Sequence, residues 1–131
     1  MIPLMVERGS GHIVNIGSVA GHQVYPGGNV YNATKFAVRA LTEGMSIDLL
    51  GTRVRVSCVS PGAVQTEFSE VRFHGDLARA EKVYKGYRPL VAEDIAEAIR
   101  YILKTPEHVN VLELVILPTA QRNVYCWDRE G

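Results

Sequence analysis

The stretch Arg53–Gly62, RVRVSCVSPG, has the composition of a buried β-strand that stops at a turn. Its valines favour an extended backbone, and a nearly continuous apolar run is typical of a strand that is covered on both faces of a sheet. Pro61 and Gly62 close the run, since these two residue types favour a turn and proline has no N–H to offer a sheet. We therefore expect a strand over residues 53–60.

Comparable patterns lie on both sides of this strand. HIVNIGS and VLELVILP each hold a short apolar run rich in β-branched residues, which indicates two more strands. Apolar residues at three- and four-residue steps predict helices, of which AEDIAEAIRYILK shows the pattern most clearly. Residues 63–90 mix charged and aromatic residues and could hold one or two short helices. The expected strands cover residues 12–17, 53–60 and 111–118, and the expected helices cover 2–8, 30–50 and 92–104.

An order of strand, helix, strand, helix and strand predicts an α/β fold with a parallel sheet covered by helices. The length of 131 residues suits one domain, spanning residues 1–131. Ligands of such sheets bind outside the carboxyl ends of the strands. This rule selects three places, which are Gly17-Ser18, Ser60-Pro61-Gly62 and Leu117-Pro118-Thr119.

The composition excludes several classes of protein. Basic and acidic side chains balance at 14 each, so no basic excess is left for nucleic-acid phosphates. The longest apolar runs fall far short of the roughly 20 residues that span a bilayer. Two distant cysteines, Cys58 and Cys126, suggest no disulfide framework, so we expect a cytoplasmic protein. The four histidines lack the spacing of metal ligands, and we expect no metal site.

The segment YNATK, Tyr31–Lys35, places a phenol and an ammonium one helical turn apart on the same helix face. A neighbouring cation favours the ionised form of a tyrosine, whose pKa is ordinarily about 10. Such a tyrosine can exchange a proton with a carbonyl or alcohol oxygen, and the hydroxyl of Ser18 could hold that oxygen. The trio therefore suits hydride transfer, with the hydride supplied by a cofactor. Taken alone, Tyr31 and Lys35 could also be a pair on the helix surface with no functional role.

Three segments, GHIVNIGSVAG, YNATKFAV and RVRVSCVSPGAVQTEF, resemble the second half of a short-chain dehydrogenase/reductase. The resemblance implies a Rossmann-like doubly wound sheet and catalysis by Ser18, Tyr31 and Lys35. It also implies that NADP or NAD is bound, with Lys35 on the nicotinamide ribose and Tyr31 beside it. The segment after the second strand would lie against the nicotinamide through Pro61, Gly62, Val64 and Thr66. Thr66 could equally cap a helix that starts near Glu67.

The segments TEFSEVRFHGDLARAEKVYKG and ILPTAQ resemble a narrower branch, the NADP-dependent 3-hydroxy acid dehydrogenases and serine dehydrogenase-like members. This resemblance implies a short 3-hydroxy acid as the alcohol substrate, interconverted with its carbonyl. Arg72 is the candidate anchor for the substrate carboxylate, because a guanidinium matches a carboxylate in shape and charge. A solvated surface arginine is the other interpretation of Arg72.

The chain shows no glycine-rich turn of the kind that receives a dinucleotide pyrophosphate. By the resemblance, that turn and the N-terminal dinucleotide-binding half would lie before Met1. The strand over residues 12–17 would then have an open edge, which we expect another chain or a rearranged segment to cover. The expected position of the dinucleotide-binding half also leaves an alternative to catalysis. In this alternative the chain is a truncated, non-catalytic fragment that retains only the fold and self-association.

The expected helix over residues 30–50 carries apolar or small residues on more than one side. A helix of this kind often packs both on its own sheet and on a partner. Members of the family commonly pair through this helix, so the resemblance implies a homo-oligomer, either a dimer or a tetramer. In the tail, we expect Tyr125 and Trp127 to pack on a neighbouring subunit.

Overall fold

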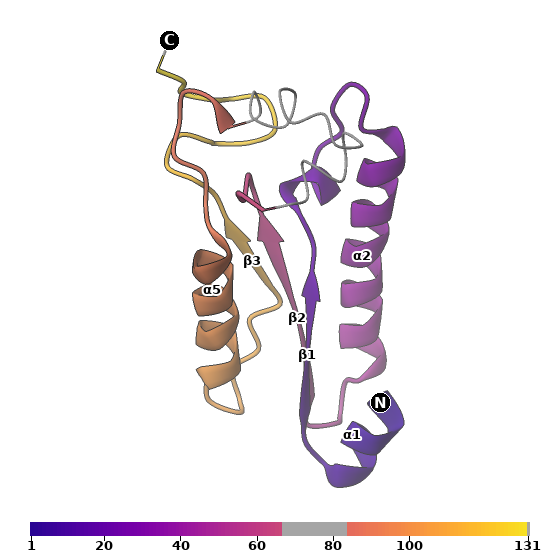
Figure 1. Cartoon of the computed structure of the whole chain (residues 1–131). Coiled ribbons are helices and arrows are strands. Elements are labelled where there is room, and N and C mark those ends of the chain that lie inside the picture. Colours follow the sequence, from indigo (N-terminus) through magenta and orange to yellow (C-terminus); the bar gives the residue numbers. More distant parts are fainter. Residues whose placement is uncertain (67–83, 131) are drawn as a thin grey trace.

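A three-stranded parallel sheet forms the centre of the protein (Figure 1). The structure is a computed structural model that describes residues 1–66 and 84–130. No helix in these two ranges is long and apolar enough to cross a membrane. The elements are α1 (Ile2–Arg8), β1 (Gly11–Ile16), the 3-10 turn η1 (Val19–Gly21), α2 (Asn29–Asp48), β2 (Val54–Pro61), α5 (Ala92–Lys104) and β3 (Glu113–Ile116).

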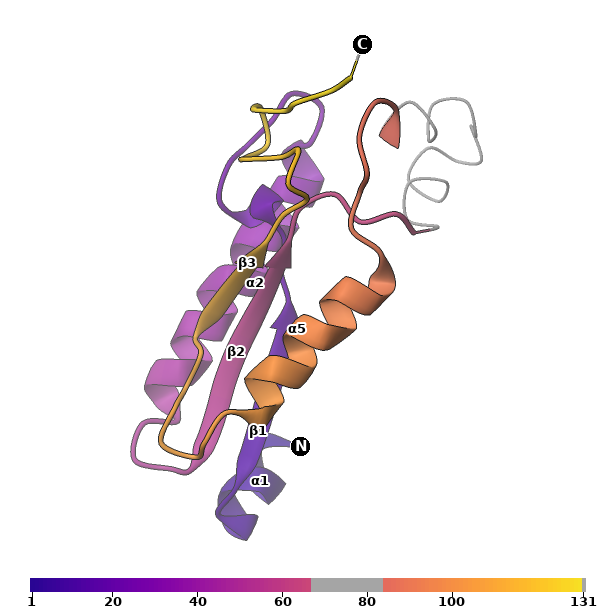
Figure 2. The same ribbon diagram turned by 90° about the vertical axis from the view of Figure 1, so that its left-hand side faces the viewer.

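The strands lie in the order β1-β2-β3, with Ile13 opposite Val56 and Val59 opposite Leu114. Figure 2 shows α2 and α5 on opposite sides of this sheet, which gives three layers. Because every strand is parallel, all three carboxyl ends meet at one edge. The predicted α/β class, with a parallel sheet covered by helices on both faces, is confirmed.

Strand β2 is the most deeply buried element, and its side chains alternate between the two faces of the sheet. Val56 packs with Leu49 in a cluster on the α2 side. Val59 packs with Ala98 and Ile102 in a second cluster on the α5 side. Burial on both faces explains why the sequence of this strand is apolar almost throughout.

Arg55 ties β2 to the end of α5. Its Nη1 donates hydrogen bonds to the hydroxyl oxygen of Thr105 at 2.8 Å and to the carbonyl oxygen of Val109 at 2.9 Å. The last carbonyl groups of a helix have no partner within the helix, and a basic side chain there is favourable. Arg55 therefore fixes the C-terminal end of α5 against the sheet.

The bounds of α2, β1 and β2 differ from the sequence-based ones by one or two residues, and β3 and η1 differ more clearly. Strand β3 covers residues 113–116 and not 111–118, since Pro118 lacks an N–H and the chain turns there, with the Gln121 N–H donating to the Pro118 carbonyl. The turn η1, in a segment expected to be a loop, is capped by the side chain of Ser18. The short helices expected within 63–90 fall largely on residues 67–83, outside the described residues.

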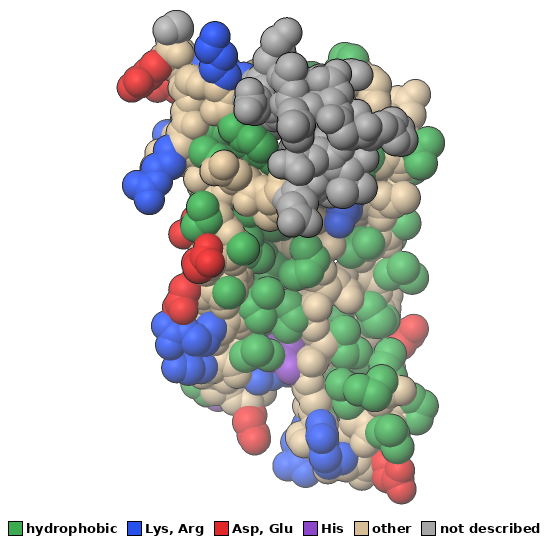
Figure 3. All heavy atoms as spheres, viewed as in Figure 1, with side chains coloured by type: hydrophobic (Ala, Val, Ile, Leu, Met, Phe, Trp, Pro, Cys, Tyr) green, Lys and Arg blue, Asp and Glu red, His purple; other side chains and the backbone are tan. Residues whose placement is uncertain are grey.

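Strand β1 lies at one end of the sheet, with β2 on its inner side. Among residues 1–66 and 84–130, no other strand pairs with it, so its outer edge has no strand neighbour in the described part of the chain. Ile16, its last residue, is 46 % exposed. Figure 3 shows hydrophobic side chains gathered over the middle of this view, between α5 and α2. Coverage of the open edge by another chain stays a prediction.

We predict that His12 makes the protein less stable in mild acid. Burial, together with the nearby charge of Arg55, lowers the pKa of His12 below its ordinary 6.5. Below pH 6.5, His12 is protonated in the unfolded chain but stays neutral in the folded chain. The free energy of unfolding therefore falls as the pH drops toward the lowered pKa of the folded state. Urea unfolding at several pH values between 5 and 8 should show that the free energy of unfolding declines less steeply with falling pH in His12→Asn than in the parent protein. His108→Asn, at an exposed histidine, serves as control. If the pH dependence of unfolding in His12→Asn equals that of the parent protein, the role given to His12 is contradicted.

Candidate active site

Ser18 lies where the chain leaves β1, next to the end of β2. The Gly17 N–H donates to the Val59 carbonyl at 2.8 Å, so pairing with β2 continues past the last residue of β1. The Ser18 Oγ accepts the Ala20 N–H at 3.1 Å and donates a long hydrogen bond of 3.5 Å to the Pro61 carbonyl. These contacts fix the serine at the junction of two strand ends.

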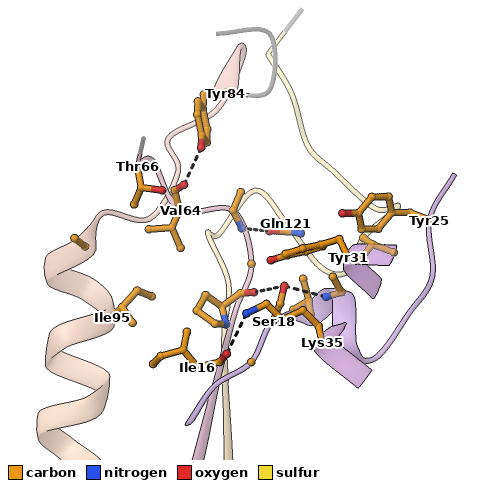
Figure 4. Close-up of a pocket in the computed structure, with 18 of the residues that line it drawn as sticks. Ile16, Ser18, Tyr25, Tyr31, Lys35, Val64, Thr66, Tyr84, Ile95 and Gln121 are labelled. Atoms are coloured by element: carbon orange, nitrogen blue, oxygen red, sulfur yellow. Dashed lines mark hydrogen bonds between the residues drawn. The ribbon is translucent and has the colours of Figure 1, made fainter. Parts of the chain in front are cut away.

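Tyr31 and Lys35 lie in the first turns of α2, which begins at Asn29. The Lys35 Nζ is 5.7 Å from the centre of the Tyr31 ring and donates a hydrogen bond of 3.1 Å to the Ile16 carbonyl. Figure 4 shows Tyr31, Lys35 and Ser18 close together, with Lys35 reaching back to the end of β1. The sequence-based trio is therefore brought into one place by α2 and the exit of β1.

The side chain of Asn32 holds α2 against the turn after Ser18. Asn32 is 1 % exposed, and its Nδ2 donates to the carbonyl oxygens of Ala20 at 2.8 Å and Gln23 at 3.0 Å. Gly21 packs equally closely on α2, because a Cβ atom there would lie 2.7 Å from the Lys35 carbonyl oxygen. The turn and the helix thus form one rigid corner, with the serine on one side and the tyrosine on the other.

The segment that follows β2 forms the opposite side of the site. The Gly62 N–H donates to the Ile116 carbonyl at 2.8 Å, which joins this segment to the end of β3. Val64 forms an isolated bridge with Leu90, and its carbonyl oxygen accepts the Tyr84 hydroxyl at 2.8 Å. The backbone of the segment is therefore held from two directions.

Ser18, Tyr31, Lys35 and the segment that follows β2 line one cavity of about 710 Å³. Ile95 and Ile99 of α5 supply an apolar wall, while a hydroxyl, a phenol and an ammonium reach the cavity from the opposite side of the sheet edge. Such a mixture of apolar walls and a few converging polar groups is typical of a ligand site. Arg72 lies outside the described residues. The predicted site residues that line the cavity are Ser18, Tyr31, Lys35, Pro61, Gly62, Val64 and Thr66.

Gln121 lines the same cavity and was missed by the sequence analysis. It is 2 % exposed, its Oε1 accepts the Ala63 N–H at 2.9 Å, and its Nε2 donates to the Asn123 carbonyl at 3.1 Å. A Cβ atom on Gly62 would lie 2.3 Å from that Oε1, so only glycine fits beneath the amide. The signal available in the sequence was its place just beyond Leu117-Pro118-Thr119, at the end of the third strand.

Three aromatic residues outside the predicted set also line the cavity, namely Tyr25, Tyr84 and Trp127. Trp127 was expected to pack on a neighbouring subunit, whereas here it packs within its own chain, with its ring centre 5.0 Å from that of Tyr87. Arg129 lies over both rings. Burial raises the pKa of Tyr87 above its ordinary value, against the opposing charge of Arg129. The tail therefore supplies part of the cavity wall.

Comparison with known proteins assigns the family. The short chain dehydrogenase family model matches residues 1–76, which is more than half of the chain. The chain belongs to this family. Its Tyr31–Lys35 segment, the turn that holds Ser18 and the segment after β2 all lie within the matched range.

Relatives and solved structures agree with this assignment. The chain is 49% identical over 122 residues to the NADP-dependent 3-hydroxy acid dehydrogenase YdfG of Escherichia coli, covering 92% of this chain and 49% of that protein. It is 46% identical to sulfoacetaldehyde reductase 2 of Chromohalobacter salexigens, covering 99% and 52%. A closed form of serine dehydrogenase complexed with NADP+ matches with a TM-score of 0.91 and 46% identity, covering 99% of this chain and 53% of the other. The expected similarity to this branch is confirmed, and the chain spans about half the length of these relatives.

We predict that Gln121→Ala destabilises the folded chain by roughly 1–3 kcal/mol, because it removes a buried amide and leaves a partly buried N–H without its acceptor. The N–H concerned is that of Ala63, which donates to the Gln121 Oε1. Urea unfolding measures the change. Gln65→Ala, at an exposed position on the same segment, is the matched control and should change stability by about 0.5 kcal/mol or less. Equal losses in the two variants would contradict the role given to Gln121.

Proposed function

We propose that the protein is an oxidoreductase that interconverts an alcohol and its carbonyl with NADP(H) or NAD(H). The observation that carries the proposal is that Ser18, at the exit of β1, and the pair Tyr31 and Lys35, on α2, line one cavity. The family membership and the names of the relatives agree with it. We also propose that residues 1–131 form a single, partial Rossmann-like domain and that the protein is cytoplasmic.

Each member of the trio has a distinct task in this proposal. Tyr31 gives a proton to the carbonyl oxygen in reduction and takes it from the alcohol in oxidation, as a general acid and base. The positive charge of Lys35, 5.7 Å from the Tyr31 ring, favours the ionised form of the phenol. Ser18 donates a hydrogen bond to the same substrate oxygen, and holds it where its charge develops.

The residues of the cavity fit a nicotinamide cofactor. When bound, this cofactor supplies or receives the hydride. A cavity of about 710 Å³ has room for the nicotinamide part beside a small substrate. Lys35 and Tyr31 would hold the ribose, while Pro61, Gly62, Val64 and Thr66 would bind the nicotinamide from the other side. The apolar wall formed by α5 excludes water from the reacting groups, which strengthens their electrostatic interactions.

The substrate we propose is a short 3-hydroxy acid. The support comes from the names of the relatives, since a 3-hydroxy acid and sulfoacetaldehyde are both small molecules that carry a negative charge. Arg72 stays the proposed anchor for that charge, on the strength of its residue type and its place in the sequence.

The first experiment adds NADPH to the purified chain and records its melting temperature and its turnover with short 3-oxo acids. A ligand that binds the native state raises apparent stability, so we expect both stabilisation and NADPH oxidation. If neither occurs, the proposal is rejected in favour of the non-catalytic alternative, a fragment that retains only fold and self-association.

We predict that Tyr31→Phe lowers kcat by at least about 100-fold, because the variant keeps the ring and loses the proton-exchanging hydroxyl. NADPH binding, followed by fluorescence, should weaken far less than kcat, because Lys35 still holds the ribose. Tyr101→Phe removes the hydroxyl of an exposed tyrosine on α5 and is the matched control. If the Tyr31→Phe variant has the same kcat as the parent protein, Tyr31 is not the general acid and base.

We further propose that the chain forms a dimer or tetramer through α2. Asn32 and Thr42 are buried, whereas Leu41 and Ile47 are exposed on the same helix. An apolar surface of this kind on a helix is typical of an interface.

We predict that Leu41→Asp shifts the protein to the monomer in analytical ultracentrifugation at micromolar concentration, since a buried charge without a partner is unfavourable. Leu103→Asp places the same charge at an exposed site on α5 and should leave the assembly unchanged. A monomeric parent protein would contradict the proposal outright.

A further inference from the structure

A cluster of polar side chains lies outside the cavity, between the sheet and α2, with Glu113 at its centre. Glu113 is the first residue of β3, and its Oε1 accepts hydrogen bonds from the Ser60 hydroxyl and the His22 Nε2, both at 2.7 Å. The Arg39 Nε lies 3.8 Å from the other carboxylate oxygen. One carboxylate therefore joins the turn after β1, the end of β2, the start of β3 and α2.

The cluster is partly shielded from water, with Arg39 at its outer side, where its side chain is 49% exposed. Ser60 is 2 % exposed, and the side chains of His22 and Glu113 are 27% and 24% exposed. Taking a carboxylate out of water is unfavourable unless hydrogen bonds replace the lost solvation. Hydrogen bonds to a charged acceptor are roughly twice as strong as neutral ones, so the cluster holds its members in defined positions.

The two residues that donate to Glu113 lie on either side of the Ser18–Pro61 contact. His22 caps η1, and its backbone N–H donates to the Val19 carbonyl at 3.0 Å, so the backbone of His22 is part of the turn that begins at Ser18. Ser60 directly precedes Pro61, whose carbonyl oxygen accepts the Ser18 hydroxyl. Glu113 thus holds together the two backbone segments that meet at the serine.

We propose that Glu113 is a positioning residue for Ser18, acting through His22 and Ser60. Asn32 holds the turn from the side of α2, and Glu113 holds it from the side of the sheet. The inference rests on the proposed function, because Ser18 is taken to hold the substrate oxygen. A displacement of about 1 Å in a reacting group can cost roughly 100-fold in rate, so a loosened turn should show directly in kcat.

The kinetic test compares Glu113→Ala with Glu113→Gln. The alanine variant loses both hydrogen bonds, and we expect kcat to fall by about 10- to 100-fold while KM for NADPH changes less than about twofold. The glutamine variant keeps an oxygen that can accept from Ser60 and His22, so it should recover most of the lost kcat. Glu43→Ala, at an exposed glutamate of α2, is the matched control and should retain the parent kcat.

Hydrogen exchange supplies a readout that needs no turnover. Glu113→Ala should speed exchange at the amides of Ala20, Gly21 and His22, which are bonded within the turn, and leave those of α5 unchanged. Faster exchange throughout α5 as well, without recovery in Glu113→Gln, would mean a general loss of structure and would overturn the proposal. Unchanged exchange in the turn, or an unchanged kcat in the alanine variant, would overturn it too. If the parent chain shows no turnover, the proposed function fails, and the exchange data alone decide whether Glu113 positions the turn.

Discussion

The buried amide of Asn32 is the contact on which the geometry of the site depends. It satisfies two backbone carbonyl groups of the turn that follows Ser18, and it belongs to the helix turn that also carries Tyr31 and Lys35. An unsatisfied polar group in this position would cost about 1–3 kcal/mol, so the turn and the helix have one favourable arrangement. That arrangement places a strand-end hydroxyl beside a phenol and an ammonium.

The sheet supplies the second constraint by bringing three chain segments to one edge. Parallel pairing makes the carboxyl ends of β1, β2 and β3 neighbours, although long stretches of sequence separate them. Close approach then depends on small residues. A Cβ atom at Gly17 would lie 2.7 Å from the Cys58 Sγ, and one at Gly62 would meet the Gln121 amide. Glycine at these positions lets the segments touch, and the polar side chains around them keep the contact in register.

The sequence was informative where a residue's role follows from local pattern. The helix over residues 92–104 was predicted with its observed bounds, because its apolar periodicity and the following Pro106 are both local signals. The trio of Ser18, Tyr31 and Lys35 was predicted to converge, and the three line one cavity. Gln121 and Trp127 were missed as cavity residues, since neither lies in a periodic segment and their neighbours come from distant parts of the chain. The length of β3 was overestimated because apolar residues continue beyond the last paired one.

By itself the sequence determined the class of fold, the order of the elements and the candidate residues for proton exchange. These follow from apolar periodicity, from turn residues and from the chemistry of side chains one helical turn apart. Only the tertiary structure decided that Asn32, Gln121 and Glu113 hold the site together. Each is a single polar residue whose partners lie on other elements, so its role exists only once the sheet has formed and burial has made an unsatisfied hydrogen bond costly.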